Sequence, residues 1–324
     1  MGDIMLKRMS IKKIIVSSTA ILLLLIIYLI PDNRKDIELK NDNIEYTYNN
    51  VVSTIYLVDS NDYVARTSIP TCKCDGTTLA SDLIDGLIVG GTKNNIIPNG
   101  FRSIIPPDAT VKSIELSDKI LTIDFSKELL EVNENDEEKM IEAIIYTLTS
   151  INGIDKVIIK VEGEVLTNLP HSKINILTVL DRSYGINKSY DLSSLNNIFS
   201  YTTYYTSTYN DHKYYVPVTK YINSEEKDVV KVIIKELGSS PIYQTNLMSY
   251  LNANAVLDSY EILDNNLKLN FNESLLNDLD KKNILEEVIY TISLSMDNIY
   301  SDLKSVSFLV NNEEVYTMNI NDIK

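Results

Sequence analysis

Apolar residues recur at two different spacings along the chain, and the same order of spacings occurs twice. Residues 121–125, "LTIDF", place an apolar side chain at every second position, which is typical of a strand with one buried face. Residues 267–271, "LKLNF", repeat this alternation in the second half of the chain. Because self-similarity at a long spacing is typical of duplicated structural units, the pattern predicts two related modules.

Each copy also contains two stretches in which apolar residues follow the helical spacing. One apolar stripe on an otherwise polar segment predicts an amphipathic helix that buries a single face. The stripes consist of Leu79, Ala80, Leu83, Ile84 and Leu87; Met140, Ile141, Ile144, Ile145 and Leu148; Val229, Val230, Ile233, Ile234 and Leu237; and Ile284, Leu285, Val288, Ile289 and Ile292. The second pair of stripes matches without a gap, and "IIYTL" returns as "VIYTI".

Short turns separate the strands of each copy, at positions rich in Asp, Asn, Ser and Gly, which favour turn conformations. The predicted turns lie at Ser117-Asp118, Glu162-Gly163, Asp264-Asn265-Asn266 and Asn311-Asn312. With a leading strand at residues 54–62, "TIYLVDSND", and at residues 203–211, "TYYTSTYND", each copy is predicted as β-α-β-β-α-β-β. Two one-sided helices on one face of a largely antiparallel sheet form a two-layer sandwich, so we expect an α/β protein of the α+β type.

The N-terminal part of the chain contains a long uncharged run. Residues 14–30 carry no charge and include "AILLLLIIYLI", and a basic cluster precedes them within residues 1–13. This pattern predicts a single transmembrane anchor with a cytoplasmic N-terminal tail and an extracytoplasmic bulk, followed by a spacer at residues 31–50. A cleaved signal peptide is the alternative, because the apolar run is short. We prefer the uncleaved anchor, since "YLIPDNRKD" offers no small-residue cleavage site and no Cys for a lipid anchor.

The repeat divides the remaining chain into two domains joined by a linker. We place the first domain at residues 51–170 and the second at residues 201–324. Residues 171–200 contain several apolar side chains, which predicts a packed linker rather than a free one. A module of this length can bury about two thirds of its unfolded surface, so each copy is large enough for its own core.

The charge balance excludes one class of partner. The chain has 324 residues, a net charge of −15 and 23% charged residues. Nucleic-acid binding requires a basic surface for phosphate contacts, so we expect no nucleic-acid partner.

A candidate catalytic carboxylate, Asp124, ends the "LTIDF" strand. Its counterpart in the second copy is Asn270, which cannot titrate, and Ser126 likewise becomes Asn272. The apolar positions persist while the chemical groups change, so a structural role is favoured. The chain contains two His residues and no nucleophile-elbow motif. We therefore predict no enzymatic activity, no catalytic residues and no cofactor.

The two cysteines of the chain, Cys72 and Cys74, lie in "TCKCDG". They could form a local disulfide, bind a metal weakly or stay reduced. A structural zinc site needs about four ligands, and His171 and His212 are distant in sequence. We therefore expect no metal site.

Tyrosines are concentrated at the start of the second copy. Tyr204, Tyr205 and Tyr209 belong to this group and are the candidate ligand or interface residues. Tyrosine is a preferred strand residue, so ordinary packing is the main interpretation. Aromatic rings also fill protein interfaces and stack on sugars, which leaves a protein partner and a glycan as alternatives.

The repeated segments resemble the GerMN domain of GerM-type sporulation and germination proteins. The residues that carry the likeness are "TIYLVDSND", "LIDGLIVGG", "IIPPDATVKSIELSDKILTIDFSKEL" and "LTSINGIDKVIIKVEGE", and the second copy follows more loosely. The resemblance implies an extracytoplasmic envelope protein of spore-forming bacteria, with modules similar to ring-building domains that assemble side by side. It places the protein between mother cell and forespore, near the transenvelope channel complex. Family members are often lipoproteins, whereas this chain has no lipid-attachment Cys, and no catalytic motif carries over.

Two functions follow from these observations. The first is a non-enzymatic, membrane-anchored scaffold that forms rings or other oligomers with sporulation envelope and channel proteins. The alternative is a binding module for peptidoglycan or another cell-wall ligand that uses the tyrosine-rich surface of the second module.

Overall fold

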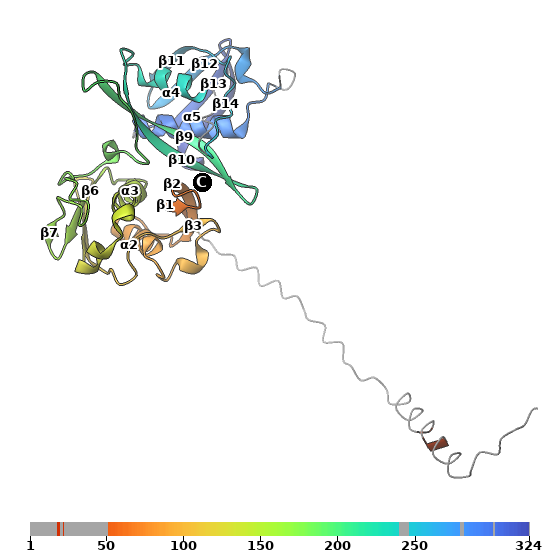
Figure 1. The fold of residues 1–324 in the computed structure, drawn as a ribbon. Helices are drawn as coiled ribbons and strands as arrows, with labels where there is room; N and C mark the ends of the chain where they lie inside the picture. The colour runs from red at the N-terminus through yellow and green to blue at the C-terminus, as the bar shows by residue number, and fades with distance from the viewer. Residues whose placement is uncertain are drawn as a thin grey trace, which may run out of the picture. The chain divides into compact units, whose positions relative to one another are not determined.

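The computed structural model describes residues 51–239, 246–278, 282–300 and 302–323, together with Ser18, Thr19 and Leu22 (Figure 1). The chain divides into two compact units, Met1–Tyr48 and Asn49–Lys324, and both modules belong to the second unit.

The predicted membrane anchor, and the single-pass membrane location that depends on it, must be corrected. No helix within the described residues is long and apolar enough to cross a membrane. Of residues 14–30, only Ser18, Thr19 and Leu22 are described, and the rest of the predicted anchor lies outside the described residues.

The first module begins with a hairpin and ends with a four-stranded sheet. Its elements are β1 (Val51–Asp59), β2 (Val64–Thr71), α2 (Gly76–Leu87), η1 (Asn94–Ile96), β3 (Phe101–Arg102), β4 (Val111–Ser117), β5 (Ile120–Phe125), η2 (Lys127–Glu131), η3 (Glu134–Asp136), α3 (Glu137–Leu148), β6 (Lys156–Val161) and β7 (Glu164–Val165). The predicted single leading strand is therefore a hairpin, and β3 is an additional short strand.

The second module repeats this order after a linker that contains η4 (Arg182–Tyr184) and β8 (Ser189–Asp191). Its elements are β9 (Ile198–Tyr209), β10 (His212–Asn223), α4 (Val229–Leu237), β11 (Leu257–Leu263), β12 (Asn266–Phe271), η5 (Glu273–Leu275), α5 (Glu286–Ile299), β13 (Ser305–Val310), β14 (Glu313–Asn319) and η6 (Ile320–Asp322). Each copy is thus a mixed α+β module built from the same sequence of hairpin, helix, strand pair, helix and strand pair.

Three sheets organise the two modules. The sheets β4-β5-β6-β7 and β11-β12-β13-β14 are equivalent, and in each the two central strands are parallel while the outer pairs are antiparallel. The third sheet has six strands and is shared, because its order β3-β1-β2-β10-β8, with β9 on β10, joins the leading hairpins of both modules. Figure 1 shows these hairpins side by side.

The helices follow the sequence prediction in α2 and α4 but not in α3 and α5. Helices α2 and α4 bury one apolar stripe, as the periodicity predicts. Helix α3 is buried along most of its residues, including Glu137, Glu142 and Thr147, and α5 buries Glu287, Thr291, Ser293 and Ser295. The two-layer sandwich with helices on one open face was therefore wrong, because α3 and α5 also pack against the leading hairpins of the shared sheet.

Candidate functional site at the junction of the two modules

The two modules meet through the second strands of their leading hairpins. Strand β10 pairs antiparallel with β2, with Tyr215 opposite Arg66. On the same side β10 also pairs in parallel with β8 of the linker, at residues 189–191. Corresponding strands of the two copies thus contact each other, which gives the junction the self-complementary character of a two-fold contact.

Asn187 of the linker fastens this strand contact. Its Oδ1 accepts the Val64 N–H at 2.9 Å, and its Nδ2 donates to the Val64 carbonyl at 2.8 Å and to the Pro217 carbonyl at 2.7 Å. One side chain therefore holds β2 and β10 together. The φ of Asn187 is 46°, a left-handed conformation that Asn adopts more readily than most residues.

A pair of tyrosines connects the first strands of the two hairpins. The hydroxyls of Tyr56 on β1 and Tyr204 on β9 are 2.8 Å apart in a buried setting. Each residue also donates its backbone N–H to a hydroxyl of the buried helix of its own module, at 2.9 Å in both cases: Tyr56 to Thr147 and Tyr204 to Ser295. The two tyrosines therefore make similar contacts with their own modules and contact each other across the junction.

Arg182 of the linker lies between the buried helices of the two modules. Its Nε donates to the Thr149 hydroxyl at 3.1 Å, just after α3, and its guanidinium lies 5.4 Å from the ring centroid of Tyr146. Its Nη1 is 3.9 Å from a carboxylate oxygen of Asp297 on α5. Burial raises the pKa of the Asp297 carboxyl, although the positive charge of Arg182 acts in the opposite direction. Arg182 therefore links α3 and α5 electrostatically.

Glu142 on α3 also contacts the linker. Its carboxylate accepts the Asn187 N–H at 3.0 Å and lies 3.5 Å from the ammonium of Lys188. Burial raises the pKa of Glu142 to about 7, despite the opposing effects of Lys188 and the Asn187 N–H. The junction therefore contains a carboxyl group that titrates near neutral pH.

Further hydrogen bonds cross the junction at its two ends. Arg66 of β2 donates to the carbonyl of Ile323 at 2.7 Å, which ties the C-terminal region to the first module. Tyr214 of β10 donates its hydroxyl to Asp59 at the end of β1, at 2.8 Å. These contacts, with Asn187 and Arg182, make the junction a structural coupling rather than a flexible hinge.

The candidate carboxylate Asp124 has a structural partner that its counterpart shares. Asp124 accepts the N–H of Gly163 at 2.9 Å, in the turn between β6 and β7. Asn270 accepts the N–H of Asn312 at 2.8 Å, in the equivalent turn between β13 and β14. The sequence comparison suggested that the chemistry of this position is lost, whereas its role as a hydrogen-bond acceptor is kept.

The position two residues further along also keeps a side-chain oxygen that accepts a backbone N–H in both copies. Ser126 accepts the Thr110 N–H at 3.0 Å, and Asn272 accepts the Val256 N–H at 3.1 Å. Serine and asparagine side chains both supply an oxygen to a backbone donor, so the exchange preserves the local fold.

Two of the three candidate tyrosines lie inside the molecule, and the third is partly covered. Tyr204 and Tyr205 are buried, 1% and 6% exposed, and Tyr205 donates its hydroxyl to Glu236 on α4 at 2.7 Å. Tyr209 is partly exposed, and its ring covers Gly100 of the first module so closely that an added Cβ would meet it at 2.6 Å. Tyr204 and Tyr209 therefore serve the contact between the modules, and the buried rings of Tyr204 and Tyr205 present no surface on which a sugar could stack.

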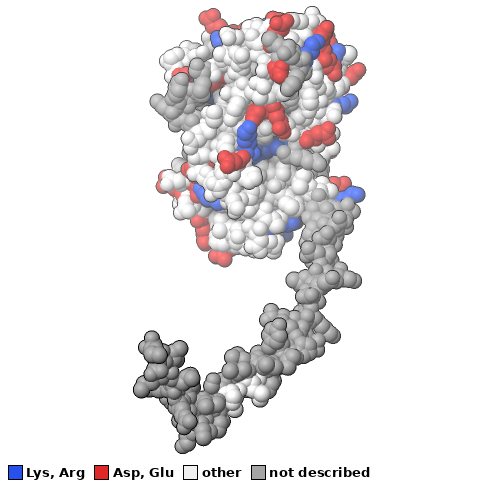
Figure 2. All heavy atoms as spheres, turned by 90° about the vertical axis from the view of Figure 1, so that its right-hand side faces the viewer, with Lys and Arg blue, Asp and Glu red and all other residues white. Residues whose placement is uncertain are grey.

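The cysteines take the first of the three alternatives that the sequence allows. Cys72 and Cys74 form a disulfide in the loop between β2 and α2. Within the described part of the chain, no three His, Cys, Asp or Glu side chains are grouped so that they could hold a metal ion. On the face shown in Figure 2, basic and acidic side chains lie in small mixed groups between uncharged areas.

The junction residues Asn187 and Arg182 were not anticipated from the sequence. They lie in "DRSYGINKS", which lacks strand or helix periodicity, and their partners are far away along the chain. The one available signal was the presence of apolar residues in the linker, of which Leu180 and Ile186 are buried.

These features define a class of protein: two similar α+β modules in tandem, coupled rigidly through a shared sheet. The family model Germane, described as sporulation and spore germination, matches residues 54–167 and 202–316. The chain therefore belongs to the Germane, or GerMN, family of sporulation and spore germination proteins, and the resemblance noted in the sequence is confirmed.

The protein named GerM of Bacillus subtilis is similar over most of the chain, both in its sequence and in a solved structure of its tandem domains. The spore germination protein GerM of strain 168 is 34% identical over 265 residues, which cover 81% of this chain and 72% of that protein. The solved structure of the tandem GerMN domains of the sporulation protein GerM covers 84% of this chain and 94% of that one, with 33% identity and a TM-score of 0.74. The tandem arrangement of α+β modules is therefore confirmed by a known structure.

Proposed function

We propose that the protein is a non-enzymatic scaffold that takes part in spore formation or germination by binding other protein subunits, including further copies of itself. The observation that carries this proposal is the rigid junction. A linker side chain, Asn187, fastens both modules to each other through three hydrogen bonds. A protein whose modules are held at a fixed angle can present two binding surfaces in a constant relative orientation, which is what a scaffold requires.

The family supports this proposal. The relative in Bacillus subtilis is named a spore germination protein, and the matching structure is titled as a sporulation protein. The side chains that were the best catalytic candidates are engaged in turns and strand ends, as the hydrogen bonds of Asp124 and Ser126 illustrate. The oxygens of these side chains are occupied by hydrogen bonds within the fold, which favours a structural function.

The test is co-purification of the full chain from sporulating cells after chemical cross-linking, combined with sedimentation of the purified chain. We expect associated proteins of the sporulating cell and a mass that rises with concentration. Asn187→Ala should weaken this association. Asn197→Ala is the control, because Asn197 also has a positive φ but lies exposed in the linker. A chain that remains monomeric and co-purifies with no other protein refutes the scaffold.

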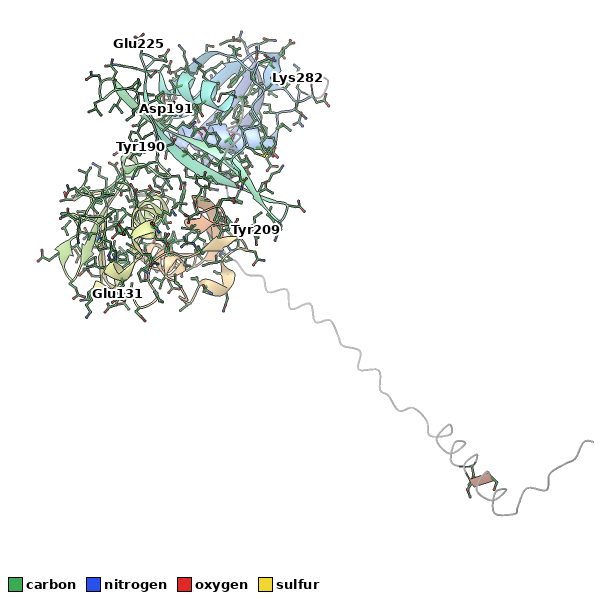
Figure 3. The ribbon with its side chains drawn as sticks, viewed as in Figure 1. Glu131, Tyr190, Asp191, Tyr209, Glu225 and Lys282 are labelled. Atoms are coloured by element: carbon green, nitrogen blue, oxygen red, sulfur yellow. A yellow bond between two sulfur atoms is a disulfide. The ribbon has the colours of Figure 1, made fainter. Side chains whose placement is uncertain are left out.

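A cell-wall ligand is the second candidate function, and one surface feature favours it. Tyr190, labelled in Figure 3, is 64% exposed, and its ring stacks on that of Tyr221 with centroids 4.8 Å apart and planes 16° apart. Asp191 follows directly and is exposed. A supported, exposed aromatic ring beside a polar acceptor is a suitable platform for a sugar.

Retention on purified cell wall tests this second candidate. We expect Tyr190→Ala to reduce retention of the full chain, while Tyr316→Ala, at another exposed tyrosine, leaves it unchanged. Equal retention of the two variants, or no retention of the unaltered chain, counts against a cell-wall ligand.

A further inference from the structure

Residues 192–197 form a projecting segment between β8 and β9. Leu195 lies in it with 88% of its surface exposed, the largest exposed fraction among the large apolar side chains of the described residues. The segment is nevertheless ordered by one side chain of β10, because Asn223 accepts the N–H groups of Ser193 at 2.7 Å and Ser194 at 3.0 Å. Asn223 also donates to the carbonyls of Ser194 and Asn196. A fixed backbone reduces the entropy lost on binding, so Leu195 is held out in a conformation ready for contact.

The projecting segment is also free of charge. No Asp, Glu, Lys, Arg or His occurs in residues 192–210, although the whole chain has a net charge of −15. Two copies of so acidic a chain repel each other, so they associate most readily through uncharged surface. Ile198, the first residue of β9, is also exposed, at 46%.

A hollow of about 340 Å³ lies in the first module, between η2 and β7. Its apolar lining consists of Leu130, Val161, Val165 and Leu166, and its polar lining consists of Lys127, Glu162, Glu164, Thr167 and Asn168. This volume is at the lower end of the range for binding pockets, about 300–1,000 Å³, and admits an aliphatic side chain with its neighbours. No residue of the projecting segment contributes to the lining, so the segment of the same chain does not fill it.

Other routes to self-association are restricted by the fold. The matching edges of the leading hairpins, on β2 and β10, already pair with each other within each chain. The edge strands β4, β11 and β14 pair with interrupted register, at Val111/Ser113, Leu257/Ser259 and Phe308/Leu309. Such irregularities discourage edge-to-edge pairing of sheets. The apolar projection and the hollow offer a pair of surfaces on different parts of the chain.

We propose that Leu195 of one copy inserts into the hollow beside β7 of a second copy, so that the chains join head to tail. This inference rests on the proposed scaffold function and names the surface that self-association uses. The contact is heterologous, because the projecting segment and the hollow are different surfaces of the chain, and it therefore generates a ring or a filament.

Site-specific photo-cross-linking locates the contact. A photoreactive amino acid at position 195 of the full chain should cross-link to a peptide within residues 127–131 or 161–168, and mixing isotopically light and heavy chains shows that the link is between copies. The same group at Leu177, an exposed leucine of the linker, is the control. Links from position 195 to other parts of the chain, or none at all, overturn the proposal.

A complementation experiment with two variants is sharper. Leu195→Asp removes the projection, and Val165→Asp, at a partly exposed residue of β7, charges the hollow. Each variant alone should associate at least tenfold more weakly than the unaltered chain, whereas Leu177→Asp should not. Mixing the two variants leaves one intact projection and one intact hollow, so a 1:1 dimer should form and grow no further.

The outcomes separate this inference from the proposed function. A mixture that stays monomeric, or variants that associate as well as the unaltered chain, overturns the head-to-tail contact. If the unaltered chain still associates in that case, the scaffold function stands with another surface. If the unaltered chain neither self-associates nor co-purifies with other proteins, both proposals fail.

Discussion

Replacing Asn187 by Ala should uncouple the two modules at a cost that the hydrogen bonds allow us to calculate. The side chain makes three bonds across the β2–β10 contact, and each contributes about 1 kcal/mol net. Alanine at a φ of 46° adds a backbone cost of about 1 kcal/mol. The expected loss in the free energy of unfolding is therefore about 4 kcal/mol, a large share of the 5–15 kcal/mol typical of a folded domain.

Urea denaturation followed by circular dichroism measures this loss. The midpoint should fall, and a single transition should separate into two with smaller m values, because each module then unfolds with less surface than the coupled pair. Asn197→Ala is the matched control: its φ is 52°, and it makes no side-chain hydrogen bond within the described residues. Its expected loss is about 1 kcal/mol, from the backbone alone. If Asn187→Ala destabilises the protein no more than Asn197→Ala, the side chain of Asn187 is not what couples the modules.

Three other experiments test the junction. The folded pKa of Glu142 is about 7, above its ordinary value of 4.5. The free energy of unfolding should therefore fall by up to about 3 kcal/mol as the pH rises from 4.5 to 7. Glu142→Gln should make the urea midpoint depend less on pH between about pH 4.5 and 8. Gly100→Ala should lower the melting temperature more than Gly153→Ala, because both have a positive φ but only Gly100 lies under a tyrosine ring. In a double-mutant cycle, Tyr56→Phe and Tyr204→Phe should show a coupling of about 1 kcal/mol, and additive effects would contradict their hydrogen bond.

The repeated elements could be predicted because periodicity reports which side of an element is buried. The stripes of α2 and α4 and the alternation of β5 and β12 were recognisable for this reason. The hairpin β1–β2 was missed because the burial along β2 does not alternate, with Val64 and Ala65 both buried.

Polar residues in buried positions explain the errors in α3 and α5. Glu142 and Thr147 read as solvent-facing residues in the sequence, but their oxygens accept backbone N–H groups of the linker and of β1. A buried polar group is tolerated once its hydrogen bonds are made, and those partners lie far away along the chain. Asn187 was not predicted for the same reason, because its hydrogen-bond partners lie on two strands from different modules.

The comparison of the two copies was informative about residue types but not about roles. Asp124 and Asn270 differ in charge, which favoured a structural role over a catalytic one, yet both accept a backbone N–H of the following turn. A single sequence cannot show which property of a side chain is used, whereas the equivalent hydrogen bonds show that both copies use the side-chain oxygen as an acceptor.

The angle between the modules of one chain and the geometry of the proposed head-to-tail contact together set how successive copies are oriented. The projecting segment is fixed to β10 by Asn223, and the hollow lies in the first module, so the rotation between successive copies includes the angle between the modules of each chain. A ring closes only when that rotation divides a full turn, and any variation in the angle accumulates from copy to copy. Asn187 therefore determines whether one size of assembly dominates. Loosening it by Asn187→Ala should broaden the distribution of assembly sizes even where the affinity at Leu195 is unchanged.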